Sequence, residues 1–232
     1  MSIKSLAYDL THPLLAIIRS NRWLIRQLFH VRIPADIRVS IDPTTIALAN
    51  AVRRTMTDDD QHIFEMGIGQ AALISLSLAK RQNVKVEGAD CSTSRVESSQ
   101  AVARVNQLEA TFIVSDLFSN VPQQTRYDLI FFNVPYVPTA QGHSLKLTER
   151  LKVDGDQMWD GGPDGTAVLA RFLREAKIHL THRGRVIFGV QNVFVADALV
   201  AQVIACSNYR LIRRERSRWI PACCYVVQPP LP

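Results

Sequence analysis

From residue 37 onward, short apolar segments alternate along the chain with segments of helical periodicity. The apolar segments have the length of buried strands and cover residues 62–69, 83–90, 111–118, 127–134, 183–190 and 222–228. The helical segments cover residues 41–54, 71–82, 93–106, 165–180 and 192–206. Strands that alternate with helices of this length pair in parallel through right-handed crossovers. The sequence therefore predicts an α/β fold built on an open, doubly wound, mostly parallel sheet.

The N-terminal part of the chain follows a different pattern. Apolar residues of segment 1–30 recur at helical spacing, which predicts one or two amphipathic helices with a break near Pro13. We therefore divide the chain into an N-terminal helical extension, residues 1–36, and a main domain, residues 37–232. The extension either clads the main domain or covers its site as a lid, and the sequence leaves both interpretations open.

The composition indicates a protein without a membrane segment or a metal. Arginines interrupt the apolar residues of the extension and no small-residue cleavage site follows them, which argues against a signal peptide and a membrane span. The cysteines lack the spacing of metal ligands, so we expect no metal site. We expect them to be buried thiols in a reducing compartment, which favours the cytoplasm. These cysteines are Cys91, Cys206, Cys223 and Cys224.

A basic run, YRLIRRERSRWIP at residues 209–221, contributes to the net charge of +6. Such a run can form a phosphate-facing patch for nucleic acid. It can also be a solvated face beside a strand, and we favour this interpretation because the run has no glycine and few interleaved aromatic residues. Nucleic acid therefore stays a possible partner but not the favoured one.

Unusual residues follow the first two predicted strands, where ligands of an open parallel sheet bind. The segment EMGIGQAA places Glu65, Gly67 and Gly69 between a strand and a helix. Glycines there let a ligand approach the backbone, and the helix N-terminus adds partial positive charge. Asp90 closes the next strand and can accept hydrogen bonds from both ribose hydroxyls, or cap the helix that begins near Ser92. The glycines and the acid together predict a nucleoside ligand.

Two further segments complete the pattern. The third strand ends in SDLF, with Asp116 and Leu117, and the fourth ends in NVPY, residues 133–136. These four sites, in this order, resemble those of class I S-adenosylmethionine (SAM)-dependent methyltransferases over roughly residues 40–228. Within that superfamily the chain is most similar to the HemK-type and small-domain enzymes. Their Asn-Pro-Pro-Tyr signature and later glycine-rich segment correspond here to NVPY and to DGGPDG, residues 160–165.

The resemblance implies a Rossmann-like sheet of seven strands and a set of site residues. The residues implied to contact SAM are Thr45, Glu65, Gly67, Gly69, Asp90, Cys91, Asp116, Leu117 and Asn133. The residues implied to act on the acceptor are Asn133, Val134, Pro135 and Tyr136. In these roles the Asn133 side chain and the Val134 carbonyl hold the acceptor nitrogen, and Tyr136 packs against the acceptor. For Thr44 and Thr45 a helix cap is the competing interpretation.

The chain departs from the family pattern in ways that bear on the acceptor. Val134 replaces the first proline of the signature, and Ala71 replaces the third glycine of the loop. The N-terminal part is also short compared with the helical domain of HemK enzymes. We therefore predict a SAM-dependent N-methyltransferase that acts on a small-molecule or amino-acid-like acceptor. Two alternatives stay open: a nucleic-acid or protein-glutamine N-methyltransferase, and an enzyme that cyclises SAM by itself and releases methylthioadenosine.

Overall fold

The computed structural model describes residues 20–81, 84–151, 153, 155–217 and 221–230. The part of the predicted N-terminal helices that falls in residues 1–19 lies outside this range. No helix among the described residues is long and apolar enough to span a membrane.

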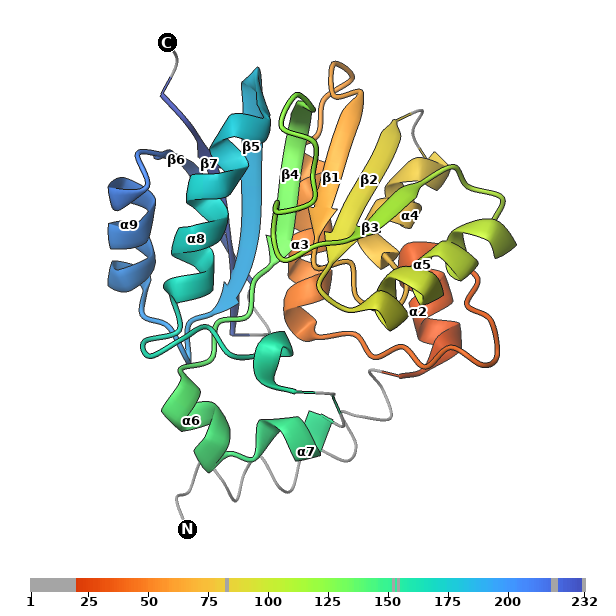
Figure 1. The fold of residues 1–232 in the computed structure, drawn as a ribbon, viewed down its shortest axis with the longest axis horizontal. Helices are drawn as coiled ribbons and strands as arrows, with labels where there is room; N and C mark the ends of the chain where they lie inside the picture. The colour runs from red at the N-terminus through yellow and green to blue at the C-terminus, as the bar shows by residue number, and fades with distance from the viewer. Residues whose placement is uncertain (1–19, 82–83, 152, 154, 218–220, 231–232) are drawn as a thin grey trace.

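A seven-stranded sheet forms the centre of the described part of the chain (Figure 1). Its strands are β1 (His62–Met66), β2 (Lys85–Asp90), β3 (Thr111–Val114), β4 (Tyr127–Asn133), β5 (Leu180–Gln191), β6 (Arg210–Arg216) and β7 (Ala222–Gln228). The strand order is β3-β2-β1-β4-β5-β7-β6, and β7 runs antiparallel to both β5 and β6. The other neighbouring strands are parallel. The prediction of a doubly wound, mostly parallel, seven-stranded sheet is confirmed.

The helices cover both faces of the sheet. They are α2 (Arg22–Phe29), α3 (Pro43–Thr55), α4 (Leu73–Arg81), α5 (Thr93–Val105), α6 (Thr139–Ser144), α7 (Leu147–Leu151), α8 (Ala167–Ala176) and α9 (Asp197–Cys206). Buried residues of α2 to α5 form one apolar cluster with one face of the sheet, and those of α8 and α9 join the cluster on the other face. Along β4, Leu129 and Phe131 point to the first cluster while Ile130 and Phe132 point to the second, as the two-residue period of a strand requires.

Several predicted boundaries were wrong. The helix predicted over 165–180 ends at Ala176, and after a short 3-10 turn the chain enters β5, which begins at Leu180. The helix predicted over 192–206 begins only at Asp197. Between β4 and α8, where the sequence predicted no element, the chain forms α6, α7 and a 3-10 turn at Asp156–Met158. Figure 1 shows α6 and α7 beyond the carboxyl ends of the central strands.

The basic run contains β6, a strand that the sequence did not predict. β6 is an exposed edge strand with a register irregularity between Leu211 and Arg213. Several of its arginines form ion pairs within the chain: Arg213 pairs with Glu215 at 2.8 Å, and Arg214 pairs with Asp197 at 3.1 Å. Ion pairs of this kind fit the interpretation of a solvated face better than that of a phosphate-binding patch.

The described part of the N-terminal extension packs on the main domain. In α2, the side chains of Ile25 and Phe29 are buried in the same cluster as residues of α3 and α4. Arg22 donates hydrogen bonds to the carbonyl oxygens of Pro34 at 2.8 Å and Ile37 at 2.8 Å, which holds the segment after the helix. These contacts suit a cladding element, and the division at residue 36 stays a prediction.

The cysteines divide into two pairs. Cys223 and Cys224 in β7 are buried, as expected. Cys91 and Cys206 are exposed, so the prediction of burial was wrong for them. Both lie at the ends of regular elements, where the chain leaves the core: Cys91 follows β2, and Cys206 ends α9.

Candidate functional site

The carboxyl ends of β1, β2 and β4 meet at one edge of the sheet, and most of the predicted site residues lie there (Figure 1). In the register of the sheet, Met66 at the end of β1 lies beside Phe132 of β4. Ala89 lies beside Met66 on the other side. The glycine segment after β1 therefore leaves the sheet between Asp90 and Asn133, the last residues of β2 and β4.

The glycine segment turns sharply and leaves open space. Gly67 and Gly69 have φ angles of +65° and +62°, in the region that favours glycine. A Cβ atom on Gly67 would lie 2.5 Å from Cε2 of Phe132, so this glycine permits close packing against β4. A Cβ atom on Gly69 would meet no atom of the described residues within 4 Å. The backbone at Gly69 is thus open to a ligand.

Asp90 holds this segment in place. Its side chain is almost fully buried, and Oδ2 accepts a hydrogen bond of 3.0 Å from the main-chain N–H of Gly69. Oδ1 accepts one of 3.1 Å from the N–H of Ser92 and lies 3.4 Å from Nη1 of Arg95. Asp90 was interpreted as a ribose contact or as a helix cap. Its carboxylate bonds the backbone at the start of α5, as a cap does, and it also orders the loop where a ribose is expected.

Glu65 is a buried acid behind the loop. Glu65 is 6% exposed, and its Oε2 accepts hydrogen bonds from the N–H of Ser75, at 3.0 Å, and from the Ser75 hydroxyl. Burial raises the pKa of Glu65 from 4.5 to about 7, against the opposing effect of the bonds from Ser75. Ser75 was not predicted as a site residue. Its only signal in the sequence was a polar position in the apolar first part of α4, a feature that it shares with Ser77.

Three further residues that the resemblance implies to contact SAM follow β2 and β3. Cys91 is exposed, with Sγ at 3.8 Å from Oδ1 of Asp90. The Asp116 side chain is 67% exposed and forms an ion pair of 2.8 Å with Arg171 of α8. Leu117 is buried and has a φ of +46°. Their contacts with a nucleoside stay a prediction.

The NVPY segment follows β4 directly. The Asn133 side chain is partly buried, and its Nδ2 donates a hydrogen bond of 3.3 Å to Oγ1 of Thr45. Its Oδ1 is buried and has no hydrogen-bond partner among the described residues. Val134, Pro135 and Tyr136 are buried. The segment thus presents one unsatisfied acceptor, which a ligand with an N–H group can fill.

Tyr136 is anchored by polar groups from two other elements. Its hydroxyl donates to Oδ2 of Asp42 at 3.1 Å and lies 3.2 Å from Oγ1 of Thr44. Asp42 is the N-cap of α3, and its side chain accepts a hydrogen bond from the N–H of Thr44. Gln191, the last residue of β5, donates to Asp42 and to Thr44, both at 3.2 Å. The sequence missed Gln191 because the predicted strand stopped one residue before it.

The DGGPDG segment packs along the chain that follows NVPY. The N–H of Gly161 donates to the carbonyl of Val137 at 2.9 Å, and the N–H of Thr139 donates to the carbonyl of Gly162 at 3.0 Å. Gly165 has a φ of +81°, and a Cβ atom there would lie 2.4 Å from the carbonyl oxygen of Tyr136. The two segments that carry the family resemblance are therefore packed against each other.

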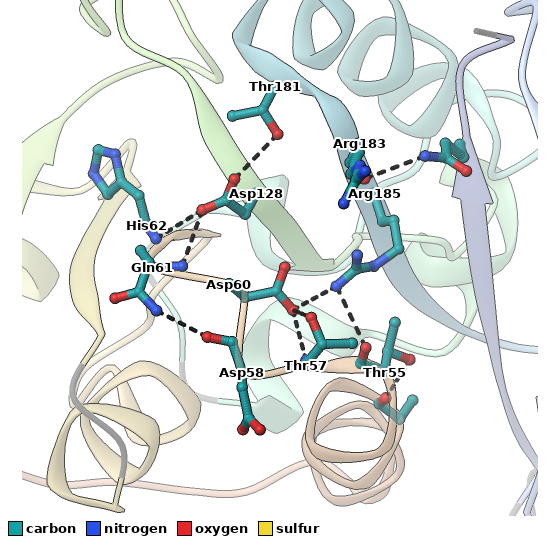
Figure 2. Close-up of polar contacts among 12 residues, drawn as sticks. Thr55, Thr57, Asp58, Asp60, Gln61, His62, Asp128, Thr181, Arg183 and Arg185 are labelled. Atoms are coloured by element: carbon teal, nitrogen blue, oxygen red, sulfur yellow. Dashed lines mark hydrogen bonds and ion pairs between the residues drawn. The ribbon is translucent and has the colours of Figure 1, made fainter.

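A separate polar network lies at the amino ends of the strands, away from the site. Figure 2 shows Asp60, before β1, paired with Arg185 of β5 at 2.5 Å. In the same view, Asp128 of β4 accepts hydrogen bonds of 3.0 Å from the N–H groups of Gln61 and His62. These bonds tie the central strands together, and we assign them a structural role.

Comparisons with known proteins identify the family of the chain. The family described as methyltransferase small domain matches residues 38–163, more than half of the chain. A putative protein N5-glutamine methyltransferase from Methanocaldococcus jannaschii is 34% identical over 125 residues, which is 54% of this chain and 59% of the relative. A release factor glutamine methyltransferase from Lactococcus lactis is 27% identical over 158 residues, 67% of this chain and 57% of the relative. The chain thus spans little more than half the length of these relatives.

A solved structure extends the comparison of folds. The ribosomal protein L11 methylase from Lactobacillus delbrueckii superposes with a TM-score of 0.64 at 14% identity, over 86% of this chain and 84% of the methylase chain. This likeness confirms the fold that the strand order had already shown.

Proposed function

Because the chain belongs to the methyltransferase small domain family, we propose that it transfers a methyl group from SAM to the side-chain nitrogen of a protein glutamine. The observation that carries the acceptor chemistry is the buried Oδ1 of Asn133 at the end of β4, which has no hydrogen-bond partner in the described part of the chain. The names of the two curated relatives, both glutamine methyltransferases, support the choice of glutamine.

The residues at the carboxyl edge fit SAM. The open backbone at Gly69 supports a cofactor beside this loop, and a carboxylate such as that of Asp90, which the Gly69 N–H bonds, can accept hydrogen bonds from ribose hydroxyls. Glu65 lies buried near the end of β1, and the resemblance implies that it contacts SAM. When bound, SAM supplies an electrophilic methyl group on its sulfonium.

Asn133 suits an amide acceptor. The nitrogen of a glutamine amide is a poor nucleophile because its lone pair is delocalised into the carbonyl. Fixed acceptors that take its hydrogens favour electron density on nitrogen as the new N–C bond forms, and they also hold the nitrogen in line with the methyl group. Oδ1 of Asn133 serves as one such acceptor, and the Val134 carbonyl is proposed as the second.

The comparisons do not support the small-molecule acceptor that the sequence favoured, and the protein-glutamine alternative fits them better. That prediction rested mainly on Val134 in place of a proline. In the structure the Val134 side chain is 1% exposed and lies in an apolar cluster of the core. The substitution therefore alters the stiffness and packing of the loop and leaves the acceptor groups of Asn133 in place.

The product distinguishes the proposal from its alternatives. The purified chain is incubated with SAM alone, with RNA, and with a release factor purified from the same organism, and the nucleoside products are identified by mass spectrometry. We expect S-adenosylhomocysteine only with the protein, together with one added methyl group on a glutamine. Methylthioadenosine from SAM alone would establish the cyclisation instead. S-adenosylhomocysteine that forms only with RNA would establish a nucleic-acid acceptor.

A further inference from the structure

The first turn of α3 reaches across the fold to the NVPY segment. Oγ1 of Thr45 accepts the 3.3 Å hydrogen bond from Nδ2 of Asn133. We propose that Thr45 is a positioning residue that fixes the orientation of the Asn133 amide, with Oδ1 directed to the acceptor nitrogen. This inference rests on the proposed function. It gives Thr45 a role different from the cofactor contact that the family resemblance implies.

The donor and acceptor chemistry of the two amides explains why the orientation matters. A glutamine side chain offers N–H donors at the nitrogen that is methylated, so the enzyme must present an acceptor there. An asparagine that turns by 180° about its last bond would present its own NH2 group instead, and two sets of donors would then face each other. The bond to Thr45 engages Nδ2, and Oδ1 is left without a hydrogen-bond partner among the described residues. In this arrangement the Thr45 hydroxyl acts as the acceptor, and the Asn133 amide presents its oxygen to the ligand.

The position of Thr45 is itself fixed by its neighbours. The N–H of Thr45 donates to the carbonyl of Asp42 at 2.9 Å, so the hydroxyl moves with the first turn of α3. The carboxylate of Asp42 in turn accepts hydrogen bonds from the Tyr136 hydroxyl and from the side-chain amide of Gln191. Since the Tyr136 proton goes to Asp42, the hydroxyl of Thr44 is the donor in its 3.2 Å contact with Tyr136. The bonds therefore lock α3, the NVPY segment and β5 to one another.

This lock is needed because of the residue between Asn133 and Pro135. A proline fixes φ near about −65° and restricts the chain, whereas Val134 leaves the loop freer in the unfolded and folded states. Hydrogen bonds from the N-cap and first turn of α3 supply the missing restraint on both sides of Val134: Thr45 holds Asn133, and Asp42 holds Tyr136. The valine and the threonine are thus parts of one arrangement.

Two substitutions at Thr45 test the inference. Thr45→Val keeps the shape of the side chain and removes the hydroxyl, and Thr45→Ser keeps the hydroxyl. Since a neutral hydrogen bond changes an equilibrium by roughly tenfold, we expect Thr45→Val to lower kcat with the release factor roughly tenfold. We expect Thr45→Ser to retain most of the activity. The Kd for S-adenosylhomocysteine, measured by calorimetry, should stay within about twofold for both variants. A loss of this affinity in parallel with turnover would overturn the inference in favour of a direct cofactor contact.

A double-mutant cycle shows whether Thr45 acts through Asn133. In an Asn133→Ala background, Thr45→Val should cause no further loss of kcat, because the group that Thr45 positions is already gone. Independent, multiplicative losses would contradict the proposed coupling. Thr55→Val is the matched control: Thr55 lies at the other end of α3, and its hydroxyl bonds the carbonyl of Ala51 at 2.7 Å. This control should leave kcat unchanged.

One readout does not depend on the acceptor. In 15N NMR spectra, the side-chain NH2 group of Asn133 is assigned by its absence from Asn133→Asp. We expect one of its protons to exchange slowly with water in the wild type and in Thr45→Ser, and faster in Thr45→Val. Equal exchange in all three proteins would overturn the inference. If no glutamine is methylated, the proposed function fails, while the NMR measurement and the binding of S-adenosylhomocysteine still decide the role of Thr45.

Discussion

The main-chain N–H of Gly69 donates a 3.0 Å hydrogen bond to Oδ2 of Asp90, 21 residues further along the chain. This bond joins the turn after β1 to the end of β2, so one carboxylate both shapes the glycine segment and closes the second strand. Because the space beside Gly69 is open while that beside Gly67 is filled by Phe132, the two glycines should respond differently to the same substitution.

Gly69→Ala should weaken cofactor binding more than it weakens the fold. The added methyl group meets no atom of the residues that the structure describes, and the positive φ costs about 1–2 kcal/mol in stability. The methyl group occupies space that we assign to SAM, so the affinity of the variant for S-adenosylhomocysteine should fall about tenfold or more. Gly67→Ala, with its clash against Phe132, should lower the free energy of unfolding further. Calorimetry measures the affinity of both variants for S-adenosylhomocysteine, and urea unfolding measures their free energies of unfolding. Unchanged affinity in Gly69→Ala would place the cofactor elsewhere.

Glu65 should make stability depend on pH. Burial raises its pKa in the folded protein from 4.5 to about 7, so the folded state binds the proton more tightly than the unfolded state. Its contribution is fully present below pH 4.5 and is lost as the pH rises through about 7. Between roughly pH 5 and pH 8, the free energy of unfolding of the wild type should therefore fall by about 3 kcal/mol because of Glu65.

Urea unfolding of wild type and Glu65→Gln at several pH values measures that contribution. The difference in unfolding free energy between the two proteins should shift in favour of the variant as the pH rises, because glutamine does not ionise. Glu109→Gln, at an exposed position, is the control and should show no such shift. A constant difference between wild type and Glu65→Gln would contradict the raised pKa.

The network of Figure 2 should matter for stability and not for chemistry. The side chains of Arg185 and Asp60 are 18% and 4% exposed, and removing one partner leaves the other charge buried. Arg185→Met should therefore lower the free energy of unfolding by about 3–5 kcal/mol. Arg183→Met, at an exposed position of the same strand, should change it by less than about 0.5 kcal/mol. Both should retain the kcat of the wild type at a temperature where they are folded, and a loss of kcat in Arg185→Met would show coupling to the site.

The sequence predicted the parts of the fold that depend on local pattern. Apolar runs gave the core strands, and their carboxyl ends correctly indicated where Asp90 and Asn133 lie. The strand Arg210–Arg216 was not predicted, because an exposed edge strand buries no face and so needs no apolar alternation. The extent of β5 escaped for a related reason: its first residues, before the buried run, are mostly polar or charged.

The contacts that complete the site could not be predicted. Thr45 and Asn133 are 88 residues apart, and no periodicity or spacing connects them. Gln191 reaches Asp42 across 149 residues for the same reason. Such contacts arise from the strand order, which places β5 and the first turn of α3 beside the end of β4. They become visible only when the three-dimensional arrangement is known.

The most direct test of the account is the site-specific methylation of a protein glutamine by wild type and Asn133→Ala. Each protein is incubated with SAM and the release factor, and the methylated position and its rate of formation are determined by tandem mass spectrometry. We predict a methyl group on the nitrogen of a glutamine side chain with the wild type, and a rate roughly 10²–10³-fold lower with Asn133→Ala. Equal rates for the two proteins, or a methyl group on another kind of residue, would contradict the central claim.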